Sequence, residues 1–184
     1  MYLGTLLLMW ENRLDRREGL VMFHVGNLVV HPMHGAGVID DIVRERVAGE
    51  WKEYYVFKMP VGGLVLKIPV ANAEVIGVRQ IISSADAEQL FCAIPGLELE
   101  SNANWNKRYQ ENMLRMTSGD LYEVARVVKA LMHRDRSRGL STGERKMLHT
   151  ARQIMLSEIV LAMNCEYREV ELRLDDAMMQ MPAM

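Results

Sequence analysis

Hydrophobic and polar residues alternate over short runs between residues 23 and 79, a pattern that predicts β-strands. The expected strands are rich in Val, Ile and Tyr, and they read "NLVVH", "AGVIDDIVRER", "KEYYVFKM", "LVLKIPV" and "AEVIGVRQI". Gly, Pro and Asn separate the runs, as they do between strands. Five short strands in so little chain predict a small, strongly bent barrel.

Two details of this region carry structural information. In "LVLKIPV", Lys67 alternates with Leu66 and Ile68, so an extended backbone places its side chain on the opposite face from these apolar residues. The preceding "GG" has the composition of a two-residue hairpin turn. Gly35 and Gly37 in "HGAG" suit a tight turn or the close approach of another backbone.

After Ser84 the apolar spacing changes to that of α-helices. The segment "ADAEQLFCAI" predicts a short helix that ends before "PG". In "ANWNKRYQENMLRM", one helical face carries Trp105, Tyr109, Met113 and Met116.

Two longer helices follow in the sequence. Ser118 is the expected N-cap of the first and Asp120 a favourable charge in its first turn. Gly139 can end this helix in a left-handed conformation. Ser141 and Glu144 fit the capping box of a second helix that continues into the 160s. Its inward positions are expected at Met147, Leu148, Ala151, Ile154, Met155 and Ile159.

The patterns therefore predict an α+β protein, with a β-barrel module joined to a compact helical module. We expect residues 1–21 to lie outside the fold, the β module to span 22–80 and the helical module 84–165, and 166–184 to be a tail or a helix extension. The linker near residue 83 is short, which limits the range of orientations of the two modules.

Composition is ordinary for a soluble globular protein, with 49% hydrophobic and 25% charged residues. The formal net charge of -2 excludes a polycation, but residues 101–158 hold 11 Lys or Arg against 6 Asp or Glu. A basic block between acidic flanks is compatible with a local nucleic-acid surface, and equally with a solvated helical face.

The chain offers little that reads as catalytic chemistry. His31 and His34 have H-x-x-H spacing without further ligands nearby, so we expect no metal site. No glycine-rich loop precedes a helix, no nucleophile stands beside a base, and we predict no cofactor and no enzymatic activity. Cys92 and Cys165 are far apart and fit a reducing cytosol. No segment reaches membrane-spanning length, so we expect a cytoplasmic protein.

Trp105 has two interpretations. It is either a core residue at an inward helical position or an exposed apolar wedge beside Lys107 and Arg108. Proteins that hold DNA open insert apolar side chains between base steps, while neighbouring cations hold the phosphates. Asn104 could cap the helix that begins there. Around the next helix–helix turn lie further cations, at Arg134, Arg136, Arg138, Arg145 and Lys146, as a phosphate-facing rim or as a solvated turn.

Four motifs occur in a recognisable order. They read "VGNLVVHPMHGAGVI", "KEYYVFKMPVGGLVLKIPVANAEVIGVR", "NWNKRYQENMLRMTSGD" and "RDRSRGLSTGERKMLHTARQI". With this order and spacing, residues 22–164 resemble the CarD/CdnL-like bacterial transcription factors. The resemblance implies a five-stranded SH3/Tudor-like module that binds the RNA polymerase β subunit. It also implies an all-helical module that contacts promoter DNA.

The resemblance also implies roles for single residues on the DNA side. The tryptophan matching Trp105 wedges into the minor groove at the upstream edge of the melted promoter. Lys107 and Arg108 match the cations that flank this wedge, and Arg145 and Lys146 match positions that approach the DNA backbone.

Lys67 matches a basic residue at the polymerase contact. Two positions depart from the family pattern. Glu45 stands where some relatives have a second basic polymerase contact, although Arg44 and Arg46 flank it and could substitute. Gln110 replaces a basic residue after "KRY", which predicts a weaker DNA contact.

These observations predict a transcription regulator that binds the polymerase β subunit and stabilises the open promoter complex through the Trp105 wedge. We expect a monomer, associated with the nucleoid through polymerase, whose own DNA binding is weak and of low sequence specificity. The alternative is a protein–protein adaptor whose helical module binds a second protein, with Trp105 as a hot-spot anchor.

Overall fold

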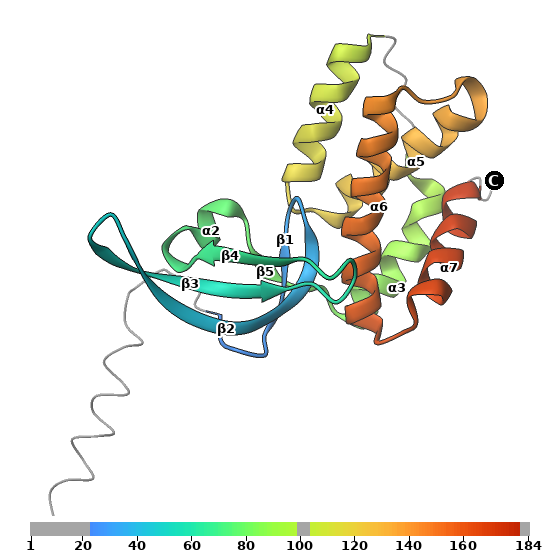
Figure 1. The fold of residues 1–184 in the computed structure, drawn as a ribbon. Helices are drawn as coiled ribbons and strands as arrows, with labels where there is room; N and C mark the ends of the chain where they lie inside the picture. Colours follow the sequence, from blue (N-terminus) through green and yellow to red (C-terminus); the bar gives the residue numbers. More distant parts are fainter. Residues whose placement is uncertain (1–22, 99–103, 181–184) are drawn as a thin grey trace, which may run out of the picture.

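One antiparallel sheet forms the first part of the chain in the computed structural model, which describes residues 23–98 and 104–180. The strands are β1 (Leu28–His31), β2 (Gly35–Val47), β3 (Glu50–Lys58), β4 (Val65–Pro69) and β5 (Arg79–Gln80). Their spatial order is β4-β3-β2-β1-β5 (Figure 1). The β2–β3 register shifts between Ile39 and Asp41, an irregularity that bends the long strand β2. The predicted five-stranded module is confirmed.

The sheet has its own apolar core. Its buried side chains come from alternate strand positions and the flanking turns: Phe23, Val29, Ile39, Tyr55, Phe57, Met59, Ile68, Ala73 and Val78. The Phe23 ring meets Tyr55 edge-on at 5.9 Å, and the Phe23 amide donates to the Tyr55 hydroxyl at 3.1 Å. Ile68 is buried while Lys67 is exposed, as the alternation predicts.

Two local predictions in the β module were wrong. Most of "AEVIGVRQI" is not a strand: after a short helix η1 (Val70–Asn72), it forms helix α2 (Ala73–Ile76). Gly77, at a φ of 87°, ends α2, so only the last residues of the run reach β5. The turn containing the glycine pair is also longer than two residues, because a hydrogen bond of 2.9 Å from Met59 N to Leu64 O closes it.

A helical bundle forms the rest of the described chain. Its helices are α3 (Ser84–Ala93), η2 (Ile94–Gly96), α4 (Trp105–Thr117), α5 (Leu121–Arg138), α6 (Thr142–Met163) and α7 (Tyr167–Met179). The capping box of Ser141 and Glu144 at the start of α6 is confirmed. The predicted cap of α5 is corrected: Asp120 accepts the hydrogen bond from Tyr122 N, whereas Ser118 closes α4.

The segment predicted as a tail or an extension of α6 is largely a separate helix of the bundle. Asn164 takes a left-handed conformation with a φ of 51°, which ends α6 and allows the chain to turn back. In α7, Val170, Leu174 and Met178 are buried in the helical core. The helical module therefore extends beyond residue 165. The extension predicted over residues 1–21 lies outside the described residues.

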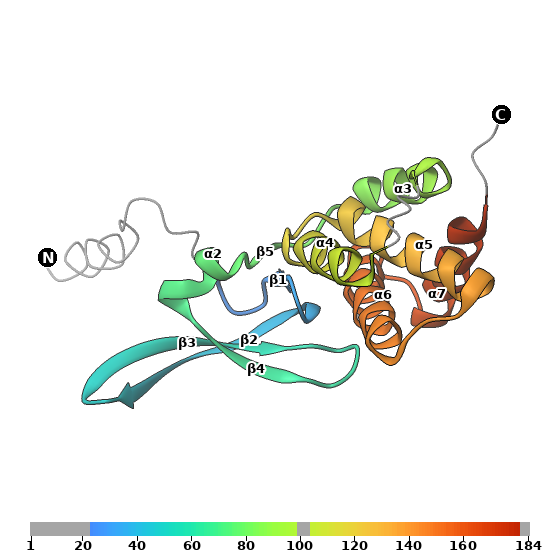
Figure 2. The same ribbon diagram turned by 90° about the horizontal axis from the view of Figure 1, so that it is seen from above.

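The sheet and the bundle lie side by side, with α6 next to the sheet (Figures 1 and 2). Met33, in the turn between β1 and β2, packs against the helical core. None of the helices within residues 23–98 and 104–180 is both long and apolar enough to cross a membrane.

Candidate functional site

Trp105 is the first residue of α4 and stands outside the helical core. Asn104 caps the helix, because its side-chain oxygen accepts hydrogen bonds from the amides of Asn106 at 3.0 Å and Lys107 at 3.3 Å. The Trp105 side chain is stacked on Tyr109, with ring centroids 5.4 Å apart and an interplanar angle of 24°. The residue keeps 44% of its surface exposed.

The apolar stripe predicted along α4 changes character along the helix. Met116 is buried, and Met113 packs at the rim of the helical core. Tyr109 and Trp105, one and two turns nearer the N-terminus, are exposed. The first turns of α4 therefore extend past the core, which explains why helical spacing alone favoured a buried Trp105.

The N-termini of α4 and α6 lie together at the end of the bundle away from the sheet (Figure 1). A Cβ added at Gly143 would lie 3.8 Å from Cζ2 of Trp105. Lys146 follows Gly143 by three residues and so projects from the same side of α6. Arg145 lies in the same first turn of α6 but projects from another side. The name basic end is used below for four exposed residues at this end of the bundle: Trp105, Lys107, Arg145 and Lys146.

Glu144 connects three helices beneath the basic end. One carboxylate oxygen accepts hydrogen bonds from the Ser141 amide at 3.0 Å and the Ser141 hydroxyl at 2.9 Å. The other lies 3.2 Å from Arg108 of α4 and 3.2 Å from Arg134 of α5. Glu144 is only 5% exposed. Burial by itself raises the pKa of this carboxyl, but the bonds from Ser141 and Arg108 and the charge of Arg134 outweigh it and lower the pKa.

Two of the arginines that could contact phosphate are paired instead with a carboxylate of the protein itself. The Arg108 side chain is only 14% exposed and pairs with Glu144, and Arg134 pairs with the same carboxylate. Lys107 faces solvent and has an i,i+4 contact of 3.8 Å to Glu111. Arg136 and Arg138 are exposed at the end of α5. The structure thus brings Trp105, Lys107, Arg145 and Lys146 to one end, and it places Arg108 underneath them.

The second candidate surface is the edge of the sheet. Lys67 lies on β4, whose outer side pairs with no strand among residues 23–98 and 104–180. Its ammonium group reaches across β3 and pairs with Glu45 of β2. Both side chains are about half exposed, so this ion pair adds little stability.

Arg44 and Arg46 do not join Lys67. Side chains alternate between faces along a strand, so both arginines project from the opposite face of β2 to Glu45. Arg44 pairs with Glu53 at 3.1 Å, and Arg46 donates to the Gly49 carbonyl at 3.3 Å. The suggestion that they substitute for a basic residue at position 45 therefore has no geometric support.

His31 and His34 meet at the turn between β1 and β2. Their ring centroids are 4.5 Å apart, and His31 Nδ1 accepts a hydrogen bond from the Met33 amide at 3.1 Å. Burial, followed by the neighbouring His34, lowers the pKa of His31 to about 4. Within the described residues, no group of three His, Cys, Asp or Glu side chains could hold a metal ion.

Sequence reasoning missed Tyr109 as the stacking partner of Trp105 and Glu144 as more than a helix cap. The stacking of Tyr109 on Trp105 had a signal in the sequence, which is the four-residue spacing between the two aromatic residues. The wider role of Glu144 had no such signal, because the approach of Arg108 and Arg134 to Glu144 depends on how three helices pack.

Known proteins match both modules in this order. A family model described as the CarD-like/TRCF RID domain matches residues 23–82, and one described as the CarD C-terminal domain matches residues 89–175. The chain belongs to the CarD-like family of transcription factors, and its function is the regulation of transcription. It is similar to the "Putative transcription factor YdeB" of Bacillus subtilis (strain 168), with 29% identity over 138 residues, which is 75% of this chain and 90% of that relative.

Proposed function

We propose that the chain binds the β subunit of RNA polymerase through the β4 edge and stabilises the open promoter complex through Trp105. The observation that carries this proposal is that Trp105, 44% exposed, lies at the same end of the bundle as the exposed cations Lys107, Arg145 and Lys146 in the first turns of α4 and α6. The core interpretation of Trp105 required a buried residue, and Trp105 keeps 44% of its surface exposed.

The β4 edge offers two means of recognition. Its outward backbone N–H and C=O groups can pair with a strand of a partner, as in β-augmentation. Lys67 supplies a cation on the same strand. Because Glu45 neutralises part of this charge, the partner has to supply an acidic group that competes with Glu45 for Lys67.

A wedge stabilises the open complex only if it binds that state better than the closed one. The base step at the edge of a melted region is already distorted, whereas unstacking an intact step costs about a few kcal/mol. Trp105 inserted there slows closure of the bubble. A preference of about 1.4 kcal/mol for the open state shifts the equilibrium tenfold.

Phosphate contacts fall to Lys107, Arg145 and Lys146, and Arg108 positions the helix that carries the wedge. Binding through the β4 edge raises the effective concentration of Trp105 at the promoter, so a weak contact with DNA suffices. Sequence specificity is low, because phosphate contacts and a wedge do not read base edges.

Polymerase pull-down combined with an open-complex lifetime assay tests the proposal. Trp105→Ala should retain polymerase and shorten the lifetime. Trp51→Ala removes Trp51 of β3, a tryptophan that is more exposed (67%) than Trp105 (44%) and lies in the other module, and it serves as the control. Equal lifetimes with wild type and Trp105→Ala would reject the wedge.

The adaptor alternative has one observation in its favour. Leu114 on α4 is 72% exposed, and an apolar side chain there suits a protein surface better than DNA. A photo-crosslinker at position 105 separates the two functions, since the wedge predicts crosslinks to promoter DNA and the adaptor predicts crosslinks to protein.

A further inference from the structure

Two consecutive residues of α6 bind two different strands of the sheet. The Ser157 hydroxyl accepts a buried hydrogen bond of 2.9 Å from the Ala36 amide of β2. The approach depends on Gly35, because a Cβ added there would lie 2.3 Å from Ser157 Oγ. Gly35 also has a φ of 95°, which L side chains rarely adopt.

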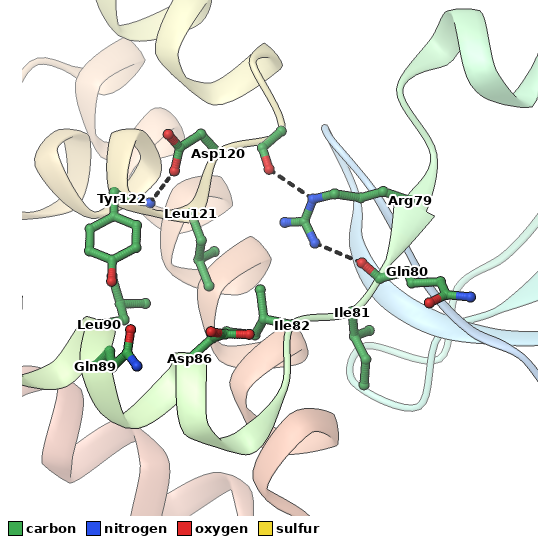
Figure 3. Close-up of a pocket in the computed structure, with 11 residues that line it drawn as sticks. Arg79, Gln80, Ile81, Ile82, Asp86, Gln89, Leu90, Asp120, Leu121 and Tyr122 are labelled. Carbon is green, nitrogen blue, oxygen red and sulfur yellow. Dashed lines mark hydrogen bonds between the residues drawn. The ribbon is translucent and has the colours of Figure 1, made fainter.

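Glu158, the next residue of α6, binds strand β5. Its carboxylate has no exposed surface and accepts two parallel hydrogen bonds from Arg79 of β5, at 2.6 and 2.9 Å. The Ile82 amide donates to the same carboxylate at 3.0 Å. Arg79 also donates from Nε to the Gly119 carbonyl at 2.9 Å (Figure 3), so its guanidinium binds both α6 and the turn between α4 and α5.

This set of bonds tolerates little change in orientation. A bidentate arginine–carboxylate pair requires both groups to be coplanar and in register. Glu158 has no exposed surface in this arrangement, and a buried carboxylate that loses its partner is strongly destabilising. The contact therefore selects one arrangement of sheet and bundle. Figure 3 shows Arg79 at the border of the two modules, beside a cleft lined by Ile82, Asp120 and Tyr122.

We propose that Arg79 and Glu158 are positioning residues that hold the two modules in a single orientation and so fix the position of Trp105 relative to the β4 edge. This inference rests on the proposed function. The physical link is α6, whose 22 residues span about 33 Å and which carries Glu158 near one end and Gly143, next to Trp105, at the other.

A fixed orientation has a functional advantage. A module that reorients freely spends little time with its wedge at the promoter, because the effective concentration of a tethered group falls as it explores more space. A fixed orientation holds Trp105 at one place once β4 is bound. The loss of Arg79 should therefore reduce the benefit of Trp105 without changing Trp105 itself.

The first experiment measures orientation in the free, full-length protein. Amide residual dipolar couplings of the wild type should fit one alignment tensor for both modules, and those of Arg79→Gln should require two. Arg173→Gln is the control, because Arg173 makes a similar bidentate pair with Glu88 inside the helical module. Two tensors in the wild type, or one in Arg79→Gln, would overturn the proposal. If Arg79→Gln does not fold, it is replaced by Arg79→Lys. This variant keeps the charge but cannot make two parallel hydrogen bonds to Glu158.

The second experiment measures coupling to the wedge. In the open-complex assay, Arg79→Gln should bind polymerase as the wild type does and shorten the lifetime, and adding Trp105→Ala should shorten it by a smaller factor than in the wild-type background. If Trp105→Ala shortened the lifetime by the same factor with and without Arg79→Gln, the positioning role would be rejected. If Trp105→Ala alone has no effect, the proposed function fails, while the dipolar couplings still decide the orientation.

Discussion

Lys107 and Arg108 are adjacent in the chain, yet their cations lie in different environments. Lys107 is exposed, and Arg108 is held against the buried carboxylate of Glu144. A helix turns by about 100° per residue, so neighbouring side chains need not share a face. The two cations of "NKRY" are thus expected to have separable roles.

Lys107→Gln should weaken binding to promoter DNA and leave stability unchanged. Loss of one phosphate contact makes the negative slope of log affinity against log salt shallower by about 1. Titrations at several salt concentrations, with polymerase present, measure this slope. An unaltered slope would remove Lys107 from the contact.

Arg108→Gln should mainly affect folding. It removes one partner of a buried carboxylate that keeps Ser141 and Arg134, so we expect a loss of about 1–3 kcal/mol in the free energy of unfolding. Denaturant titration measures the loss, with Arg136→Gln, an exposed neighbour on α5, as the control. A variant as stable as the wild type would show that Glu144 does not need Arg108.

Glu144 should make stability depend on pH. The pKa of this carboxyl is lower in the folded protein than its ordinary value of 4.5. Its contribution is therefore complete above that value and is lost as the pH falls through the lowered pKa. Unfolding of wild type and Glu144→Gln, measured from neutral pH to about pH 3, should give curves that converge at the acidic end. Parallel curves would contradict the assignment.

The Lys67–Glu45 pair predicts opposite effects of two charge changes. Lys67→Glu should weaken binding of the polymerase β subunit without lowering the melting temperature, because both side chains are about half exposed. Glu45→Lys should strengthen binding, since it frees Lys67 and adds a second cation. Arg168→Glu on α7 controls for net charge. Equal affinity of both variants would place the contact elsewhere.

Tyr109→Ala should shorten the open-complex lifetime less than Trp105→Ala does. Tyr109 stacks on the indole and restricts its orientation, but the indole itself fills the gap in the proposed mechanism. The lifetime assay ranks the two variants. An effect of Tyr109→Ala larger than that of Trp105→Ala would make Tyr109 the wedge.

Local patterns predicted most elements well, because capping residues and apolar spacing act over a few residues. The box of Ser141 and Glu144 and the alternation around Lys67 were read directly from the sequence. Ala73–Ile76 was misassigned, since its apolar residues suit a strand as well as a single helical turn.

The candidate site was predicted only in part. The exposure of Trp105 depends on how far α4 extends past the core, and the environment of Arg108 depends on where α6 places Glu144. The pair between Arg79 and Glu158 joins residues that are 79 positions apart, and no local pattern indicates it.

The open side of β4 has a consequence for the protein's behaviour in concentrated solution. A strand whose hydrogen-bonding groups face outward can add to the sheet of an identical molecule and start aggregation, and a charged side chain on that strand opposes such pairing. Lys67 thus opposes self-association through the same strand that is proposed to bind polymerase. An apolar replacement of Lys67 is expected to lower solubility even though the fold persists.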